Sequence, residues 1–179
     1  MGEFLKIGHR GARGWAPENT MRAFRWAAAW KLDGIEFDVR RTKEGAIVVF
    51  HDATLERKVI GASGFLKDLT LEEVKKLRVG DQEIPTLFEV CREFGGKMLL
   101  NIELKETGLQ DQVLDIVRSL GLLDSVIVSA FARDENDFGS SSTWQDLFWM
   151  KAWENRLKIG LIAAKPDWLK QAILAAHSD

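Results

Sequence analysis

The sequence has no tyrosine, one cysteine and three histidines among its 179 residues. A single cysteine, Cys91, excludes an intrachain disulfide, so a reducing compartment such as the cytoplasm is expected. The absence of a Cys/His cluster also excludes the ligand pattern of a structural zinc site.

The chain also lacks long hydrophobic runs and a charge excess of either sign. No apolar stretch reaches the ~18 residues of a transmembrane helix, and the N-terminus lacks the apolar core of a signal peptide, so no integral membrane association is expected. Lys+Arg total 25 and Asp+Glu total 27, which gives no reason to expect a nucleic-acid partner. Hydrophobic residues make up 46%, which is typical of a globular protein, and we expect a single domain over residues 1–179.

Short apolar runs alternate with helical stretches along the chain, as in parallel sheets built from βαβ units. Thr70 and Thr86 each precede a glutamate by three residues, which is the spacing of a helix capping box, and Asn19 or Thr20 can cap an earlier helix. The sequence thus predicts an α/β fold. The candidate strands are residues 4–8, 34–40, 46–51, 98–105, 125–130 and 158–163.

Two candidate strands carry acidic side chains on one face only. Because successive side chains of a strand point to opposite faces, Glu36 and Asp38 share one face of strand 34–40, and Glu103 lies on the polar face of strand 98–105. A solvated antiparallel strand would explain one such pattern. Two of them, in a chain of alternating strands and helices, favour a shared polar site, because inward-facing polar groups need partners. At the C-terminal ends of (β/α) barrel strands these carboxylates would converge on one divalent ion, Mg²⁺ or Ca²⁺.

Two of the histidines lie at the ends of candidate strands. Either His9 or His51, taken alone, is more often a structural or surface residue. As a pair beside a carboxylate–metal site they suggest a general acid and a general base. Arg10 and Lys105 would add positive charge and hydrogen-bond donors for a phosphate group. This combination suits the cleavage of a phosphoester.

These residues belong to short runs that together resemble the glycerophosphodiester phosphodiesterase family. The resemblance extends over about residues 4–130 and includes the order and spacing of the runs. Each run alone is a weak signal, and their combination is specific. The runs are His9-Arg10-Gly11, Pro17-Glu18-Asn19-Thr20, Gly34-Ile35-Glu36-Phe37-Asp38-Val39, Val49-Phe50-His51-Asp52 with Leu55 and Arg57, Ile84-Pro85-Thr86-Leu87, and Asn101-Ile102-Glu103-Leu104-Lys105.

The resemblance implies a TIM-type (β/α) barrel, one divalent metal ion and a small-molecule substrate. The implied reaction is the hydrolysis of glycerophosphodiesters to glycerol 3-phosphate and an alcohol. The roles that it implies, position by position, are metal ligation by Glu36, Asp38 and Glu103, acid–base catalysis by His9 and His51, and phosphate binding by Arg10 and Lys105.

The number of candidate strands departs from the family pattern. A TIM barrel has eight strands and typically ~250 residues, whereas six candidate strands are found here, so we expect an incomplete barrel. Its exposed sheet edges predict pairing with a second copy of the chain. Two alternatives stay open. One is a phospholipase D-like or phosphatidylinositol-type lipase on the same scaffold, and the other is a truncated remnant without catalytic activity.

Overall fold

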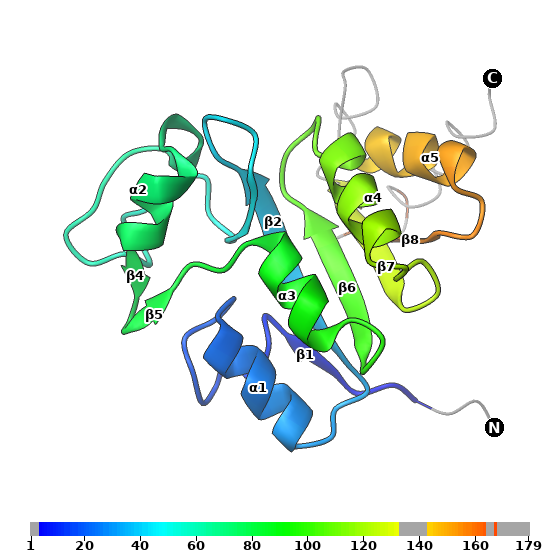
Figure 1. Ribbon diagram of the computed structural model, residues 1–179, viewed down its shortest axis with the longest axis horizontal. Helices are drawn as coiled ribbons and strands as arrows, with labels where there is room; N and C mark the ends of the chain where they lie inside the picture. The colour runs from blue at the N-terminus through cyan, green and yellow to red at the C-terminus, as the bar shows by residue number, and fades with distance from the viewer. Residues whose placement is uncertain (1–3, 133–142, 164–166, 168–179) are drawn as a thin grey trace.

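A six-stranded sheet forms the centre of the molecule (Figure 1). The computed structural model describes residues 4–132, 143–163 and 167. Five strands pair in parallel in the order β1-β2-β6-β7-β8. Strand β3 pairs in the antiparallel direction with the C-terminal part of β2. The strands of the sheet are β1 (Ile7–His9), β2 (Gly34–Arg41), β3 (Ile47–Val49), β6 (Leu99–Leu104), β7 (Val126–Ala132) and β8 (Lys158–Ala163).

Helices connect the parallel strands and cover one face of the sheet. Figure 1 shows α1, α3 and α4 along this face, and side chains of all three belong to one buried cluster with the strands. This is the layering of a (β/α) barrel over part of its circumference, and the predicted α/β class is confirmed. The helices of this layer are α1 (Met21–Ala29), α3 (Leu87–Phe94), α4 (Gln110–Ser119) and α5 (Thr143–Trp153).

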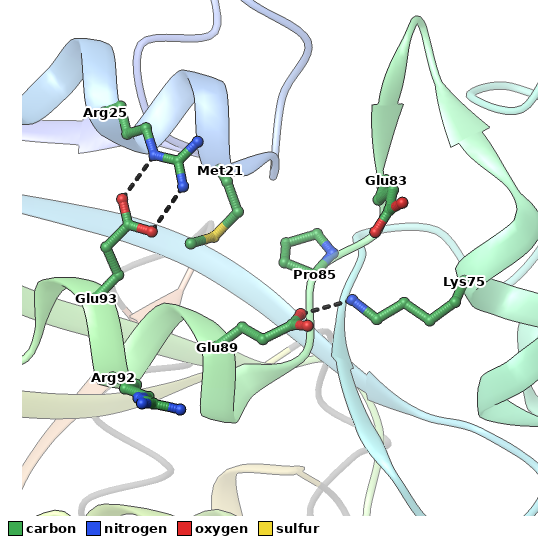
Figure 2. Close-up of a pocket in the computed structure, with 8 residues that line it drawn as sticks. All are labelled: Met21, Arg25, Lys75, Glu83, Pro85, Glu89, Arg92 and Glu93. Carbon is green, nitrogen blue, oxygen red and sulfur yellow. Dashed lines mark hydrogen bonds and ion pairs between the residues drawn. The ribbon is translucent and has the colours of Figure 1, made fainter.

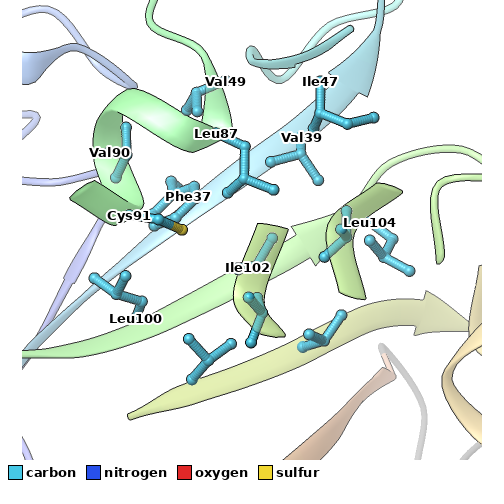
Figure 3. Packing of buried hydrophobic residues seen from close by; sticks show 14 of the residues in the cluster. Phe37, Val39, Ile47, Val49, Leu87, Val90, Cys91, Leu100, Ile102 and Leu104 are labelled. Carbon is cyan, nitrogen blue, oxygen red and sulfur yellow. The ribbon is translucent and has the colours of Figure 1, made fainter. Parts of the chain in front are cut away.

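The main core lies between the sheet and this helical layer. Phe37 of β2 and Ile102 of β6 are fully buried, and α3 places Val90 and Cys91 against the same cluster (Figure 3). Each such aliphatic or aromatic side chain contributes roughly 1.5–3 kcal/mol when it leaves water. The apolar faces predicted by strand alternation therefore point toward the helices, which leaves the other face of the sheet for polar residues.

The helices begin where the sequence predicts. Thr70 and Thr86 each close a complete capping box, and Thr20 caps α1 by accepting a hydrogen bond from the backbone N–H of Ala23 at 3.3 Å. Asn19, the other candidate cap, has a positive φ of 58° and turns toward the sheet. Within the described ranges, no helix combines the length and apolar character that crossing a bilayer requires.

The predicted strand 46–51 has a different place in the fold from the one expected. It forms β3, which runs antiparallel to β2 and is not a barrel strand. Only residues 42–46 separate the two strands, a length that allows a hairpin but not the crossover of a dozen or more residues that parallel pairing needs. Five of the six predicted strands therefore belong to the barrel wall.

A small subdomain follows β3 and has a core of its own. It contains η1 (Leu66–Asp68), α2 (Leu71–Lys76) and a hairpin of β4 (Arg78–Val79) and β5 (Gln82–Glu83). Val48 and Phe50 pack there with Leu66 and Val74. The two-residue strands were not predicted, because runs that short carry no periodic signal. The subdomain matters for the site because it holds the segment after β3 in place.

Strand β1 is shorter than predicted and begins at Ile7 instead of residue 4. Among the described strands it pairs only with β2, so its other edge is open. Ile7 of this strand is 37% exposed. An open edge with apolar side chains invites pairing with another strand, and the formation of a homo-oligomer through this edge stays a prediction.

Candidate active site

Three carboxylates from two neighbouring strands converge on the face of the sheet that the helices leave free. The pairing of β2 with β6 places Asp38 directly beside Glu103, and Glu36 lies two residues earlier on β2. One oxygen from each carboxylate lies within 4.8 Å of the other two. All three residues are buried, with Asp38 fully so. The period of two along each strand is what brings them to the same side.

The hydrogen bonds around this triad leave some of its oxygens without a donor. Glu36 accepts from the backbone N–H of Arg10 at 2.9 Å, Asp38 accepts from Asn19 Nδ2 at 2.8 Å, and Glu103 accepts from Lys105 Nζ at 2.6 Å. Within the described part of the chain, the buried atoms Glu36 Oε1 and Asp38 Oδ1 accept no hydrogen bond, although Lys105 Nζ lies 3.6 Å from the latter. Unsatisfied buried carboxylate oxygens are the donor set of a hard cation.

The crowding of negative charge has a marked effect on Glu36. Burial and then repulsion from Asp38 raise the pKa of this carboxyl to about 8, against the opposing hydrogen bond from the Arg10 backbone. A divalent cation among the three oxygens would supply the compensating charge. The triad therefore fits a metal ion by both its donor atoms and its electrostatics.

Two cationic side chains border the triad. Arg10 follows β1 with a positive φ of 57°, an uncommon conformation for a residue with a side chain, and its Nε lies 3.2 Å from Asp38 Oδ2. Lys105 follows β6 and contacts Glu103 and Asp38. Both cations lie beside the triad, where they can reach an anion bound to a metal ion.

The two histidines approach the triad from different elements. His9 ends β1 in register with Glu36, and its Nε2 lies 3.6 Å from Glu36 Oε2. Partial burial and the nearby Arg13 and Arg10 hold the pKa of His9 below its usual value, against the pull of the acidic residues. A neutral imidazole at neutral pH is thus favoured there.

His51 lies at the site for a reason other than the predicted one. It does not end a parallel strand at the barrel mouth; it follows the antiparallel strand β3. The backbone N–H of Phe50 donates to the Asp38 carbonyl at 2.9 Å, and Arg40 Nε donates to the His51 carbonyl at 2.8 Å. These bonds tie the His51 backbone to β2 near the triad. Its Nδ1 lies 2.6 Å from Asp52 Oδ1.

The sequence as a whole matches a known family of phosphodiesterases. The model of the Glycerophosphoryl diester phosphodiesterase family matches residues 9–178. The chain belongs to this family. It is 41% identical over 141 residues to the glycerophosphodiester phosphodiesterase of Caldanaerobacter subterraneus subsp. tengcongensis, a match that covers 71% of this chain and 58% of that relative. A glycerophosphodiester phosphodiesterase of Bacillus subtilis is 31% identical over 156 residues, with coverage of 73% and 53%. The chain thus spans a little over half the length of these relatives.

Solved structures of the family share the fold described above. A glycerophosphodiester phosphodiesterase from Agrobacterium tumefaciens superposes with a TM-score of 0.74 at 26% identity, covering 87% of this chain and 65% of its own. A phosphodiesterase from Oleispira antarctica, solved in complex with the product sn-glycerol-3-phosphate, gives a TM-score of 0.72 at 27% identity, with coverage of 94% and 70%. The predicted family and the predicted partial (β/α) barrel are both confirmed.

Four further residues of the site carried no predicted role in catalysis or binding, although all four stand in the family's sequence runs. Asn19 bonds Asp38, and Glu18 contacts Arg10 at 2.9 Å. Asp52 bonds His51, and its carboxylate in turn accepts two hydrogen bonds from Arg57. Their position in the runs was the available signal, but the partners of a polar loop residue depend on which loops meet in space.

A separate hollow of about 440 Å³ lies between α1, α3 and the β4–β5 hairpin (Figure 2). Two ion pairs cross it, Arg25 with Glu93 and Lys75 with Glu89. None of the predicted site residues lines it. These four charged side chains already pair with each other, so they do not indicate a bound ligand. The triad differs because it contains buried oxygens that accept no hydrogen bond.

Proposed function

We propose that this protein hydrolyses glycerophosphodiesters to glycerol 3-phosphate and an alcohol. The observation that carries the proposal is the buried carboxylate triad with unsatisfied oxygens, flanked by two imidazoles and two cations on one face of the sheet. Membership of the phosphodiesterase family supports it, as does the solved relative that holds sn-glycerol-3-phosphate. The lipase alternative has no comparable support from these relatives.

The triad would hold one divalent metal ion, Mg²⁺ or Ca²⁺. Glu36, Asp38 and Glu103 would supply its protein ligands, since a hard cation prefers carboxylate oxygens and completes its shell with water. When bound, the ion would stabilise negative charge on the phosphoryl oxygens. Asn19 would keep Asp38 oriented by its hydrogen bond, as outer partners of metal ligands commonly do.

Arg10 and Lys105 would bind the substrate phosphate. Both already lie within 3.6 Å of the triad, so a phosphate on the ion would come within their reach. Their donors would bind the two non-bridging oxygens of the phosphate. Since those oxygens gain charge in the transition state, the same contacts would be strongest there.

His9 and His51 would move the protons of the reaction. Hydrolysis joins a water oxygen to phosphorus and breaks the bond from phosphorus to the alcohol oxygen. One imidazole would take the proton from the attacking oxygen, and the other would protonate the departing alcohol. The hydrogen bond from His51 Nδ1 to Asp52 leaves Nε2 of that ring for this exchange.

An assay of the purified chain with glycerophosphocholine tests this function. Release of glycerol 3-phosphate with Mg²⁺ or Ca²⁺, and its loss on addition of a chelator, are expected. Hydrolysis of a phosphatidylinositol or lysophospholipid with no action on glycerophosphocholine would support a lipase instead. Absence of turnover on all of these, in a folded protein that binds the ion, would identify a remnant without catalytic activity.

We expect ion binding to release a proton at neutral pH. Because burial and Asp38 raise the pKa of Glu36 to about 8, its carboxyl is protonated at pH 7 and must lose that proton to ligate a cation. Affinity should rise by about tenfold for each pH unit below 8 and become constant above it. Titration calorimetry in buffers of different ionisation enthalpy measures the proton directly.

The same shift sets the pH dependence of stability without an ion. The folded protein holds the proton of the Glu36 carboxyl more tightly than the unfolded chain does. The contribution of this proton to the free energy of unfolding is therefore complete below about pH 4.5 and declines until the pH passes about 8. Glu36→Gln should remove this decline.

The prediction of proton release on ion binding has its own contradicting outcome, which is ion binding at pH 6 with no proton released.

A further inference from the structure

Glu18 occupies the centre of a cluster of cations beside the proposed active site. Arg10 Nη1 lies 2.9 Å from Glu18 Oε1, Arg57 Nη2 lies 3.3 Å from the same oxygen, and Lys58 Nζ lies 2.9 Å from Oε2. The Glu18 side chain is only 12% exposed. Although burial acts in the other direction, these cations hold the pKa of Glu18 below its usual value, so it carries a full charge at neutral pH.

Two of these cations contact different parts of the site. Arg10 contacts the triad through Asp38. Arg57 donates to both oxygens of Asp52 at 2.5 and 2.7 Å, and Asp52 contacts His51 Nδ1. Despite the burial of Asp52, the hydrogen bonds from Arg57 and His51 lower its pKa to about 2. An ionised carboxylate only accepts, so the ring proton of His51 resides on Nδ1.

Glu18 therefore joins two loops that the chain order keeps apart. Arg10 and Glu18 come from the loop between β1 and α1, whereas Arg57 and Lys58 come from the segment after β3. Both guanidinium groups approach the same oxygen of Glu18. Without the negative charge these like charges would repel each other, and each long side chain would regain its rotamer freedom.

We propose that Glu18 is a positioning residue, which aligns the phosphate-binding Arg10 with the proton-transferring His51 by holding Arg57 on Asp52. This inference rests on the proposed function for its catalytic consequence. Glu18 itself contacts neither the triad nor the imidazole in the interactions described, so its effect must pass through Arg10 and Arg57. The opposing interpretation is that Glu18 only fastens a loop and affects stability alone.

Coupling between Glu18 and Asp52 distinguishes the two interpretations. In the 179-residue chain, kcat and KM for glycerophosphocholine would be measured with saturating ion for Glu18→Gln, Asp52→Asn and the double variant. If both residues act through Arg57, each single substitution lowers kcat by about tenfold or more. The kcat of the double variant then stays within about twofold of that of the less active single variant. Effects that multiply, or a Glu18→Gln enzyme with unchanged kcat and only a lower Tm, would overturn the proposal.

Glu93→Gln is the matched control. Like Glu18, Glu93 accepts hydrogen bonds from arginine, but both come from Arg25 on the outer surface between α1 and α3. The Glu93→Gln substitution should leave kcat unchanged. Combined with Asp52→Asn, it should give the same kcat as Asp52→Asn alone. If Glu18→Gln does not fold, Arg57→Lys replaces it, since lysine keeps the charge but cannot bridge Asp52 and Glu18 in the same way.

A measurement without turnover separates this inference from the proposed function. Nitrogen-15 NMR of the histidine rings reports which nitrogen of His51 carries the proton. We expect an Nδ1–H ring in the wild type and in Glu93→Gln, and a shifted His51 signal in Glu18→Gln or Arg57→Lys. An unchanged His51 signal in these variants would overturn the positioning role. A wild type that fails to hydrolyse any diester would overturn the proposed function alone.

Discussion

Glu103→Gln is expected to abolish turnover and to weaken divalent-ion binding by more than 100-fold, with little effect on folding. The substitution removes one of three ligand charges while keeping an oxygen that can accept the hydrogen bond from Lys105. Loss of an outer partner of a metal ligand typically costs ~10–100-fold in affinity, so loss of a ligand charge should exceed this. Calorimetric titration with Mg²⁺ and Ca²⁺ gives the affinity, and a glycerophosphocholine assay gives the turnover.

The stability of this variant provides an independent check. Asp38 and Glu103 both raise the pKa of Glu36, so removing one charge relieves repulsion within the triad. The ion-free variant should unfold at the same temperature as the wild type or above it. Asp115→Asn, at an exposed position of α4, is a suitable control for the loss of a carboxylate. Unchanged ion affinity in Glu103→Gln would show that the triad is not the metal site.

His9→Ala and His51→Ala should each reduce kcat by about 10²–10⁴-fold, the usual contribution of general acid–base catalysis. Neither imidazole belongs to the carboxylate triad, so ion affinity should change little in either variant. A substrate with a very good leaving group needs no proton on the departing oxygen. Such a substrate should restore activity only to the variant that lacks the acid, which assigns the two roles.

The outcome for each histidine is separable from damage to the fold. His9 is half exposed, and truncation of His51 leaves its partner Asp52 with two hydrogen bonds from Arg57. Thermal melting should therefore show two folded proteins. Activity close to that of the wild type under saturating ion would identify the histidine concerned as structural.

Much of the site was predictable because strand geometry is simple. The alternation of side chains placed Glu36, Asp38 and Glu103 on one face, and the parallel register of β2 and β6 brought them together. The capping boxes at Thr70 and Thr86 were equally local, since each depends on a hydroxyl and a glutamate within a single turn. Predictions of this kind succeed because each sequence pattern lies within a single strand or a single helical turn.

His51 shows the limit of this reasoning. The prediction placed it near the carboxylates, and the structure does so, yet through an antiparallel hairpin and not a barrel strand. The apolar pattern of a short strand is the same in either direction. The five-residue connection from β2 was the signal for a hairpin, and it was outweighed by the alternation of strands and helices elsewhere in the chain.

By itself, the sequence determined the α/β class, the family, the inward face of the two acidic strands and the starts of the helices. These depend on periodicity and on contacts within a few residues. Only the tertiary structure decided the direction of β3, the unsatisfied oxygens of Glu36 and Asp38, and the path from Glu18 through Arg57 to His51. These features depend on which loops meet in space. A long polar side chain there has several partners within reach, and burial determines the free-energy cost of leaving a polar group without a hydrogen bond.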